Sequence, residues 1–496
     1  MNPAVPARIQ RIVIVGGGSA GWMTAAALAT GLRGKGIDIE LVESEQVATV
    51  GVGEATFPSI LNYNRMVGID ETEFLRATDG TFKLGIFFHD WRVKGEHYFH
   101  SFGDLGQLAG PHALWGQHRR LGLAGNLDHQ SLPAVMAREG RFVVAEPPKP
   151  PYDYAYQFDA ALYAAFLRRL AMQRGVRHTL GHIVNVQRRP DGGVAGLLLA
   201  DGRQLTGDLF IDCSGFRSLL LGQTLAEPFL DYSHWLPVDA AWACPTERVG
   251  EALPPYTRAT ALEGGWAWRI PLRSRTGNGH VFSSRFIDVE KAREQLLQQL
   301  DGAPLAEPRL LRFTTGQRQR FWVGNVLAIG LSSGFLEPLE STSIYLIQCG
   351  ISRLMVQLTE GGPLDDEAVA RFNEGAATQF RRIRDFIILH YCTTARRDSA
   401  LWRHVASMEL PDTLAFKMEA WRRFGVVHQY DEEAFGTTSW LSVYSGMGCW
   451  PECADPVLDE LPRQEAARAL EGRAQAIRRA VEPLPAHHRY LADRLR

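Results

Sequence analysis

The chain lacks the features that mark membrane, secreted and nucleic-acid-binding proteins. Its apolar runs are far shorter than a membrane span, and its first residues show no basic region followed by an apolar core and a cleavage site. The formal net charge is only −2, which leaves no electrostatic footprint for nucleic acid. We therefore expect a cytoplasmic protein with neither a membrane nor a nucleic-acid partner, present as a monomer or a homodimer.

Cysteine is also scarce, with six residues scattered along 496 positions. Cys449 and Cys453 are four residues apart, but no second Cys or His pair completes a zinc site. We expect buried free thiols and no metal. With 45% apolar and 22% charged residues, the composition is that of an ordinary globular protein. The length suits two or three domains, or one large α/β domain with an elaborated second part.

The first strong pattern is a glycine-rich turn between a short apolar strand and a helix. Residues 12–15 are β-branched and apolar, the glycines follow with GxGxxG spacing, and residues 23–30 favour a helix. Gly16 suits a tight turn, Gly18 lets a pyrophosphate approach the backbone, and Gly21 lets the helix pack on the strand. The pattern predicts a dinucleotide site.

Two neighbouring features support this site. The N–H groups and positive dipole end of the helix, at Ser19 and Ala20, are suited to phosphates. A second strand, at residues 37–42, ends at Glu43, where an acid accepts ribose hydroxyls. No Arg or Lys lies beside Glu43 to take a 2′-phosphate, so the sequence favours FAD or NAD over NADP.

Further segments are expected to return to the same sheet and complete the cofactor site. They are the glycine-rich loop at residues 50–58, the strand and turn at residues 209–215, and the strand, loop and helix at residues 326–344. Only one dinucleotide fingerprint is present, so we expect a single FAD whose reduced form comes from a separate reductase. The cofactor-binding residues predicted from these segments, besides those of the first turn, are Gly53, Ile329, Gly330 and Leu336.

The pattern of elements predicts an α/β fold. Residues 1–365 are expected to form a Rossmann-type FAD-binding domain with an inserted β-sheet substrate region, rich in tryptophan between residues 235 and 300. Residues 366–496 are mostly helical and arginine-rich, and we expect them to form a subdomain that covers the substrate pocket. An aromatic strand near residue 83 carries Lys83, which by position alone is typical of a solvated outer face.

Three motifs together resemble the flavin-dependent halogenases of the tryptophan halogenase type, over nearly the whole chain. The first is the turn that ends in Gly21-Trp22. The second is Trp266-x-Trp268-x-Ile270-Pro271, which looks like the WxWxIP motif that separates these enzymes from flavin hydroxylases. The third is the segment at residues 335–342, Phe-Leu-Glu-Pro-Leu-Glu-Ser-Thr.

This resemblance implies a flavin monooxygenase fold of the p-hydroxybenzoate hydroxylase type (GR2) and a halogenating activity. In the family, reduced FAD, oxygen and a halide, bromide or chloride, generate hypohalous acid. That acid travels through a tunnel to a separate pocket, where it halogenates an electron-rich aromatic. Lys83 matches the lysine and Glu340 the glutamate that direct the electrophile. The halide site matches the amides of Thr342 and Ser343, and relatives often have glycine at position 343.

The resemblance also implies a substrate pocket and a tunnel. His100 and Phe102 match the residues that sandwich the substrate ring, Pro338 and Trp450 are further candidates, and Trp266 and Trp268 would form the tunnel wall. The tail contains no convincing match to the residues that bind the amino-acid group of tryptophan. An indole that lacks this group is therefore as suitable a substrate as tryptophan.

Alternative interpretations remain at this level. The main one is an FAD-dependent aromatic hydroxylase, which needs no halide and oxidises NADPH itself. A second is a flavin-binding protein without catalysis. For single residues, Lys83 fits a solvated strand, Glu340 fits a carboxylate at a helix N-terminus, and the two tryptophans fit plain core aromatics.

Overall fold

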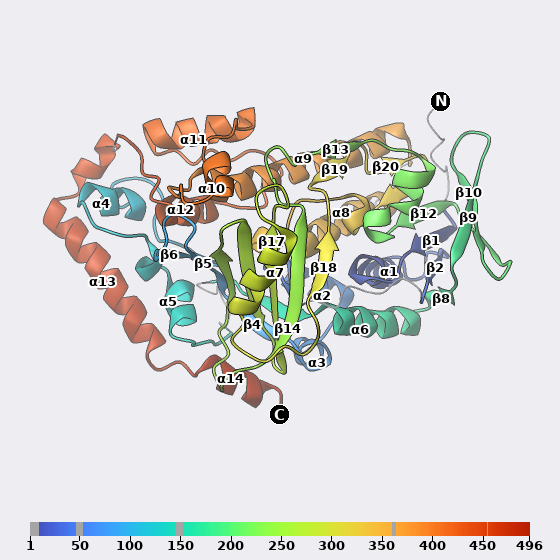
Figure 1. Cartoon of the computed structure of the whole chain (residues 1–496), viewed down its shortest axis with the longest axis horizontal. Helices are drawn as coiled ribbons and strands as arrows, with labels where there is room; N and C mark the ends of the chain where they lie inside the picture. Colours follow the sequence, from blue (N-terminus) through green and yellow to red (C-terminus); the bar gives the residue numbers. More distant parts are fainter. Residues whose placement is uncertain (1–8, 46–52, 145–151, 360–363, 454) are drawn as a thin grey trace. The chain divides into compact units, whose positions relative to one another are not determined.

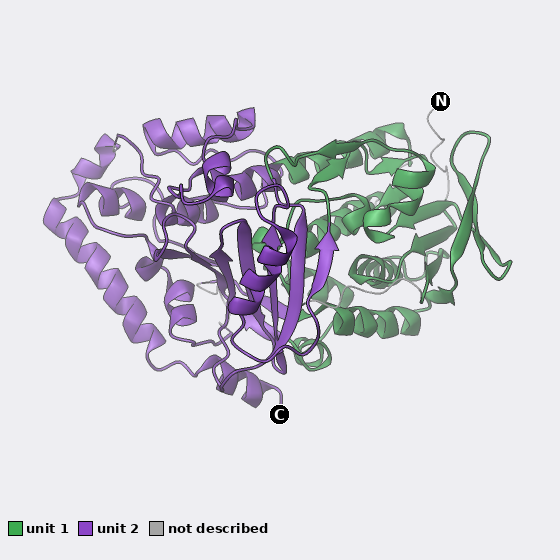
Figure 2. Cartoon of the chain, viewed as in Figure 1, with its two compact units in different colours: residues 1–80, 158–236, 313–381 green, residues 81–157, 237–312, 382–496 purple. Residues whose placement is uncertain are grey.

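The computed structural model describes residues 9–45, 53–144, 152–359, 364–453 and 455–496. Contacts divide the chain into two units, and each unit is assembled from three separate stretches (Figure 2). Unit 1 comprises residues 1–80, 158–236 and 313–381, and unit 2 comprises residues 81–157, 237–312 and 382–496. This division does not follow the predicted boundary between residues 365 and 366, which rests on composition and stays a prediction.

Unit 1 contains the predicted nucleotide-binding sheet. The β-branched strand lies inside the sheet, between two parallel neighbours at residues 38–43 and 209–212, and its four apolar residues are buried. The order is β20-β21-β12-β1-β2-β8, parallel except for the edge strand β20. The strands are β1 (Arg11–Val15), β2 (Asp38–Glu43), β8 (Arg177–Leu180), β12 (Leu209–Asp212), β20 (Trp322–Val323) and β21 (Val326–Ala328). The predicted strands at residues 12–15, 37–42 and 209–212 are confirmed.

The remaining elements of unit 1 surround this sheet (Figure 1). Its helices are α1 (Ser19–Gly31), α2 (Ser59–Val67), α3 (Glu71–Ala77), α6 (Ala160–Gln173), α8 (Thr342–Thr359) and the first part of α9 (Asp366–Cys392), with helical turns η2 (Gly215–Arg217), η3 (Leu219–Thr224), η4 (Gly330–Ser332) and η5 (Leu339–Ser341). The small strands are β3 (Gly53–Ala55), β9 (Ile183–Arg188), β10 (Val194–Leu199), β11 (Gln204–Thr206), β13 (Phe229–Asp231), β19 (Gly316–Arg318) and β22 (Gly334–Phe335). The alanine-rich α1 is buried along most of its length, because small side chains allow close packing.

Unit 2 is built on a seven-stranded sheet of order β18-β14-β17-β16-β15-β5-β6. All pairs are antiparallel except β15 with β5. The strands are β5 (Gly85–His89), β6 (His97–Ser101), β14 (Ala240–Glu247), β15 (Thr257–Ala261), β16 (Gly265–Pro271), β17 (Arg275–Phe282) and β18 (Arg309–Arg312), with β4 (Thr81–Lys83) pairing separately with β7 (Ala155–Asp159). The strand-rich region predicted at residues 235–300 is confirmed.

The helices of unit 2 come mainly from the C-terminal part of the chain, as predicted. They are α4 (Leu114–Arg120), η1 (Asp128–Gln130), α5 (Leu132–Arg138), α7 (Val289–Gln298), the end of α9, α10 (Ala400–Val405), α11 (Asp412–Phe424), α12 (Thr437–Gly446), η6 (Pro456–Glu460), α13 (Arg463–Val481) and α14 (His487–Arg494). Within α13 the apolar residues Ala466, Leu470 and Ile477 are buried.

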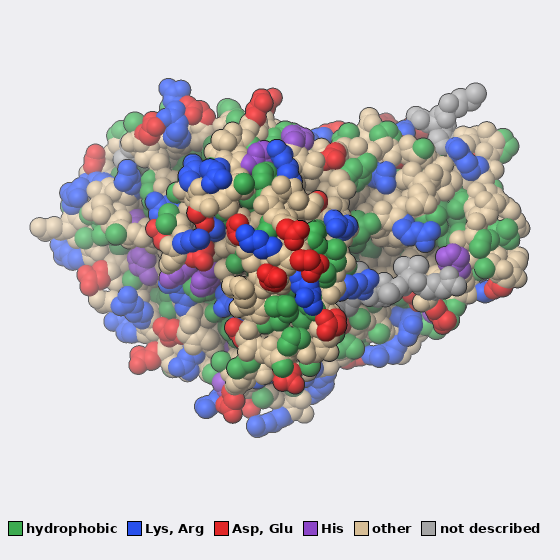
Figure 3. Space-filling model, viewed as in Figure 1, with side chains coloured by type: hydrophobic (Ala, Val, Ile, Leu, Met, Phe, Trp, Pro, Cys, Tyr) green, Lys and Arg blue, Asp and Glu red, His purple; other side chains and the backbone are tan. Residues whose placement is uncertain are grey.

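The surface carries charges of both signs. On the face shown in Figure 3, Lys and Arg side chains are interspersed with Asp and Glu, and no extended patch of one sign is in view. Among the described segments, no helix combines the length and the apolar character needed to cross a bilayer.

Candidate functional site

The glycine-rich turn of unit 1 leaves open space at the start of α1. Gly16 has a φ of +114°, and a Cβ built on Gly21 would lie 1.8 Å from the carbonyl oxygen of Gly16. By contrast, a Cβ on Gly18 would meet nothing within 4 Å. Gly18 is the N-cap of α1 and provides no side chain to cap the first amides of the helix, near Ser19 and Ala20. The turn therefore combines open space with uncapped N–H groups, which fits a pyrophosphate.

Glu43 lies at the end of β2, beside this turn. A Cβ on Gly17 would be 1.5 Å from Oε2 of Glu43, so the carboxylate lies directly against the Gly17 backbone. Oε1 lies 2.8 Å from Nε2 of His178. The predicted ribose-binding acid thus lies next to the predicted phosphate-binding turn.

The other predicted cofactor residues follow strands of the same unit. The Ile329 N–H donates to the carbonyl oxygen of Asp212 on the neighbouring strand. Gly330 has a φ of +82°, and a Cβ there would lie 2.7 Å from the Cβ of Ala20, so this loop touches the start of α1. Leu336 is buried, as is Gly53 in β3. Residues 50–52 of the predicted loop lie outside the described residues.

The turn before α8 carries Glu340 in an unusual backbone conformation. Glu340 and Ser341 have φ values of 65° and 59°, in the left-handed region that non-glycine residues seldom occupy. The glutamate is 2% exposed. Pro338 begins this turn, and its carbonyl oxygen accepts the Ser341 N–H at 3.0 Å. A non-glycine residue in this region costs about 1–3 kcal/mol, and such strain concentrates at functional sites.

The predicted halide residues begin α8. Thr342 is buried and Ser343 is partly buried. They directly follow the two left-handed residues. Their amides belong to the first turn of α8, a helix of 18 residues. Amides of the first turn lack partners within a helix and favour anions. The halide site at these two residues stays a prediction.

Lys83 lies in unit 2, at the end of β4. It is 0% exposed, so the interpretation as a solvated outer-face lysine is wrong. Its strand pairs with β7, where Lys83 lies opposite Ala155. The ammonium group is 5.3 Å from the centre of the Phe102 ring, within the range of a cation–π contact. Unit 2 therefore contains a buried ammonium group beside an aromatic ring.

His100 and Phe102 lie together, as the strand period predicts. Their ring centres are 6.4 Å apart. His100 also contacts Phe386 of α9 at 5.6 Å and Phe435 at 6.0 Å, and these two phenylalanines stack on each other at 3.9 Å. Lys83, His100 and Phe102 thus form one aromatic cluster with residues from the C-terminal part of the chain.

Trp450, the fourth predicted substrate residue, has its ring contact outside the cluster of Lys83, His100 and Phe102. It stacks on His118 of α4, with ring centres 5.5 Å apart and planes at 20°. The structure therefore brings together the lysine, the histidine and the phenylalanine of the predicted pocket, while Trp450 contacts a different part of unit 2.

Trp266 and Trp268 lie on one face of β16, with ring centres 6.3 Å apart. A Cβ on Gly279, the cross-strand partner of Trp268, would lie 2.1 Å from the indole, so the ring covers that glycine. Trp266 contacts Trp91 at 6.3 Å. Both indole N–H groups are buried and lack a hydrogen-bond partner within the described residues. The pair shares one face, as predicted, and its role in a tunnel stays a prediction.

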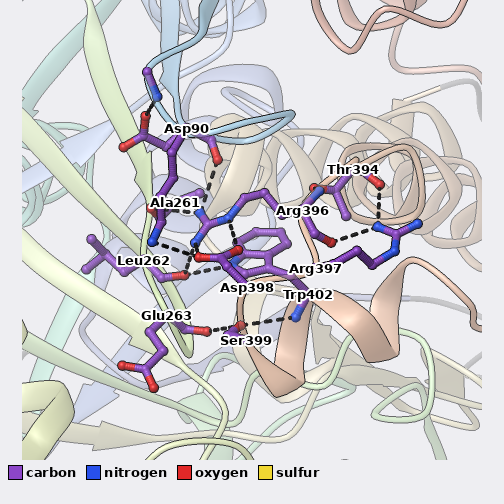
Figure 4. Close-up of polar contacts among 12 residues, drawn as sticks. Asp90, Ala261, Leu262, Glu263, Thr394, Arg396, Arg397, Asp398, Ser399 and Trp402 are labelled. Carbon is purple, nitrogen blue, oxygen red and sulfur yellow. Dashed lines mark hydrogen bonds and ion pairs between the residues drawn. The ribbon is translucent and has the colours of Figure 1, made fainter.

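Arg396 anchors the hairpin that begins β16, and sequence reasoning missed it (Figure 4). Its guanidinium group donates to the carbonyl oxygens of Asp90 and Ala261, both at 3.1 Å. Trp402 Nε1 donates to the carbonyl oxygen of Leu262 at 2.6 Å, and Arg396 lies 4.7 Å from the Trp402 ring. The strand that carries the two tryptophans is thus held in place by the segment after α9. Because the tail is rich in arginine, the sequence does not show that this one arginine anchors a distant hairpin.

A buried ion pair was also missed. Lys417 of α11 pairs with Glu433, and its ammonium group lies 3.8 Å from the centre of the Trp440 ring. Burial lowers the pKa of Lys417 and raises the pKa of Glu433, while the partner charge opposes both shifts. Trp440 in turn contacts Phe386 at 5.2 Å, so this pair lies one ring beyond the aromatic cluster. No group of three His, Cys, Asp or Glu side chains suited to a metal ion occurs among the described residues.

The chain is similar to known proteins along nearly its whole length. The family model described as tryptophan halogenase matches residues 11–463. The chain is 34% identical to tryptophan 6-halogenase SttH of Streptomyces toxytricini, over 97% of this chain and 98% of the relative.

Among solved structures, Xcc4156, a flavin-dependent halogenase from Xanthomonas campestris, is 46% identical, with 98% of each chain covered and a TM-score of 0.93. BrvH, a flavin-dependent halogenase from Brevundimonas sp. BAL3, is 42% identical, with a TM-score of 0.93 and coverage of 98% of this chain and 99% of that one.

Proposed function

Because the chain belongs to the tryptophan halogenase family and is therefore a flavin-dependent halogenase, we propose that it halogenates an electron-rich aromatic ring, an indole or a tryptophan derivative, with bromide or chloride. The observation that carries the substrate class is the cluster of Lys83, His100 and Phe102. It combines a fully buried ammonium group with two aromatic rings. A flat aromatic substrate is suited to such surroundings.

The cofactor in this proposal is FAD, held at the glycine-rich turn. Gly18 leaves room for the pyrophosphate, the first amides of α1 donate to it, and Glu43 accepts from the ribose. Reduced FAD supplies the oxygen chemistry that converts halide into hypohalous acid. Since the sequence has one dinucleotide fingerprint, a separate reductase supplies the reduced flavin.

The chain's own residues then direct the halogen. The Lys83 ammonium donates a hydrogen bond to the oxygen of hypohalous acid and fixes the halogen over one ring carbon. As the carbon–halogen bond forms, the bond between oxygen and halogen breaks, and the oxygen leaves as water with a proton from Lys83. The Glu340 carboxylate takes the proton that the ring loses. The amides of Thr342 and Ser343 hold the halide before it is oxidised.

The aromatic residues position the substrate ring and shield the path to it. His100 and Phe102 hold the substrate ring, and Trp266 and Trp268 form the wall of the path to it. Pro338 stays a predicted substrate residue. Trp450 stays a prediction, because its described contact is with His118. The Lys417–Glu433 pair beside Trp440 is already neutralised within the protein.

The test uses the protein with FAD, a flavin reductase, NADH and bromide or chloride, over a panel of indoles that includes tryptophan. Mass spectrometry should detect halogenated products that depend on halide, on reductase and on the protein. Hydroxylated products formed without halide, with rapid bleaching of the flavin by NADPH alone, would support an aromatic hydroxylase instead.

A further inference from the structure

Trp22 follows the last glycine of the turn. The motif assigns phosphate binding to the glycines before it and gives Trp22 no role. In the structure its side chain is 1% exposed, at the start of α1. Its indole contacts the imidazole ring of His178 edge-to-face, with centres 5.2 Å apart and planes at 68°. The tryptophan therefore packs against a side chain from another strand of the sheet.

His178 connects this contact to the cofactor site. It lies on β8, whose neighbour is β2, and in the register it is opposite Leu41, two residues before Glu43. Its Nε2 lies 2.8 Å from Oε1 of Glu43. An ionised carboxylate only accepts hydrogen bonds, so the imidazole must carry a proton on Nε2 and donate it.

The second carboxylate oxygen is confined as well. Oε2 lies against Gly17, where even a methyl group would come within 1.5 Å of it. Glu43 is thus fixed on one side by a hydrogen bond from His178 and on the other by the backbone of the turn. The Glu43 side chain is 19% exposed, so a ligand can still reach it.

We propose that His178 is a positioning residue for FAD: it orients the Glu43 carboxylate toward the ribose, and Trp22 fixes the imidazole ring for that task. This inference rests on the proposed placement of FAD at the glycine-rich turn. A carboxylate held in its binding rotamer before the cofactor arrives loses less side-chain freedom on binding. His178 therefore raises FAD affinity without touching the cofactor.

The experiment measures the FAD dissociation constant by the change in flavin fluorescence, with no turnover involved. His178→Phe keeps a ring against Trp22 but removes the donor, and it should weaken FAD binding about tenfold, as expected for loss of a hydrogen bond to a charged group. His178→Gln keeps an N–H donor and should bind within about threefold of the parent. His234→Phe is the matched control, because His234 also packs on a tryptophan of unit 1, Trp235.

A double-variant cycle separates positioning from a general structural role. If His178 acts through Glu43, adding His178→Phe to Glu43→Gln should weaken FAD binding no further than Glu43→Gln alone. Trp22→Phe should weaken binding less than His178→Phe, about threefold, because the donor remains.

Three outcomes would overturn the inference: parental affinity in His178→Phe, equal loss in His178→Phe and His178→Gln, or additive losses in the double variant. Failure of the proposed cofactor site looks different. In that case Gly18→Val, which fills the open space of the turn, would bind FAD as the parent does.

Discussion

Lys83 and Glu340 are both buried, but the two units hold them in different ways. Lys83 lies on an extended strand of unit 2, where pairing with β7 and the ring of Phe102 surround it. Glu340 lies in a turn of unit 1 with a φ of 65°, next to a second left-handed residue, Ser341. Strand pairing and packing place the lysine, whereas a costly backbone conformation places the glutamate. The first arrangement has no positive φ in its backbone, whereas the second persists only because its surroundings impose it.

The largest expected effect is at the lysine. Lys83→Ala should abolish halogenated product, because no other residue of the proposed pocket holds the electrophile over the ring. Oxygen should still be consumed, since the proposed flavin site lies in residues of unit 1. Product and oxygen are measured in one reaction, with Lys291→Ala, an exposed lysine of unit 2, as control. Near-parental product would refute the role of Lys83.

Glu340→Gln should have the next largest effect. The amide keeps the size of the side chain but cannot take a proton, and loss of a positioned acid–base group costs about a hundredfold or more in rate. The rate of product formation is compared with that of Glu374→Gln, an exposed glutamate of the same unit. If oxygen consumption falls together with product, Glu340 belongs to the flavin chemistry and the contrast with Lys83 is wrong.

A pH test addresses how the lysine's strand is held. The Phe82 N–H donates to Nε2 of His487, whose Nδ1 donates to the Leu253 carbonyl oxygen. Burial lowers the pKa of His487 to about 4, below the value near 6.5 of an unfolded chain. The stability that the neutral ring provides is therefore complete above about pH 6.5 and is lost as the pH falls toward 4.

Between pH 7.5 and pH 5, the parent should lose about 2 kcal/mol more unfolding free energy than His487→Gln, which does not titrate. Urea denaturation at both pH values provides the measurement, and all other titrating groups cancel in the difference. Equal losses in both proteins would mean that protonation of His487 does not weaken the hold on β4.

The smallest effects distinguish the strained turn from the helix after it. Ser341→Gly should stabilise the protein by about 0.5–1 kcal/mol, because glycine adopts positive φ without strain. Ser343→Gly, two residues later in α8, should destabilise it by about 0.5 kcal/mol, because glycine weakens a helix. Thermal unfolding of the two variants should therefore shift in opposite directions. A shift in the same direction would mean that the turn is not strained.

The sequence predicts local and periodic features of both units well. The strand at residues 12–15, its glycines and Glu43 follow one another closely, so each limits where the next can lie. The shared face of Trp266 and Trp268 follows from the period of two in a strand. Residues 60–74 have the apolar spacing of one helix, but in the structure they are divided between α2 and α3, and α2 ends at Gly68, which has a φ of 67°.

Features that depend on distant contacts could not be predicted. Lys83 looked solvated because a strand pattern does not show which face another segment covers. His178 lies in a short polar strand with no motif, and only sheet order brings it beside Glu43. No glycine marks the left-handed turn at Glu340. Trp450 was predicted from the family resemblance alone, and its contact depends on the position of α4, which lies far from it in the sequence.

The order of strands in unit 1 has a consequence during synthesis. Ile12 of β1 pairs with Leu209 of β12, so the apolar first strand leaves the ribosome about 200 residues before one of its two neighbours. At about 5 to 20 residues per second, this wait lasts about 10 to 40 s. During that time one edge of a strand of isoleucine and valine is open to other chains. Slower growth and chaperone supply should therefore improve the yield of folded protein more than changes at the active site.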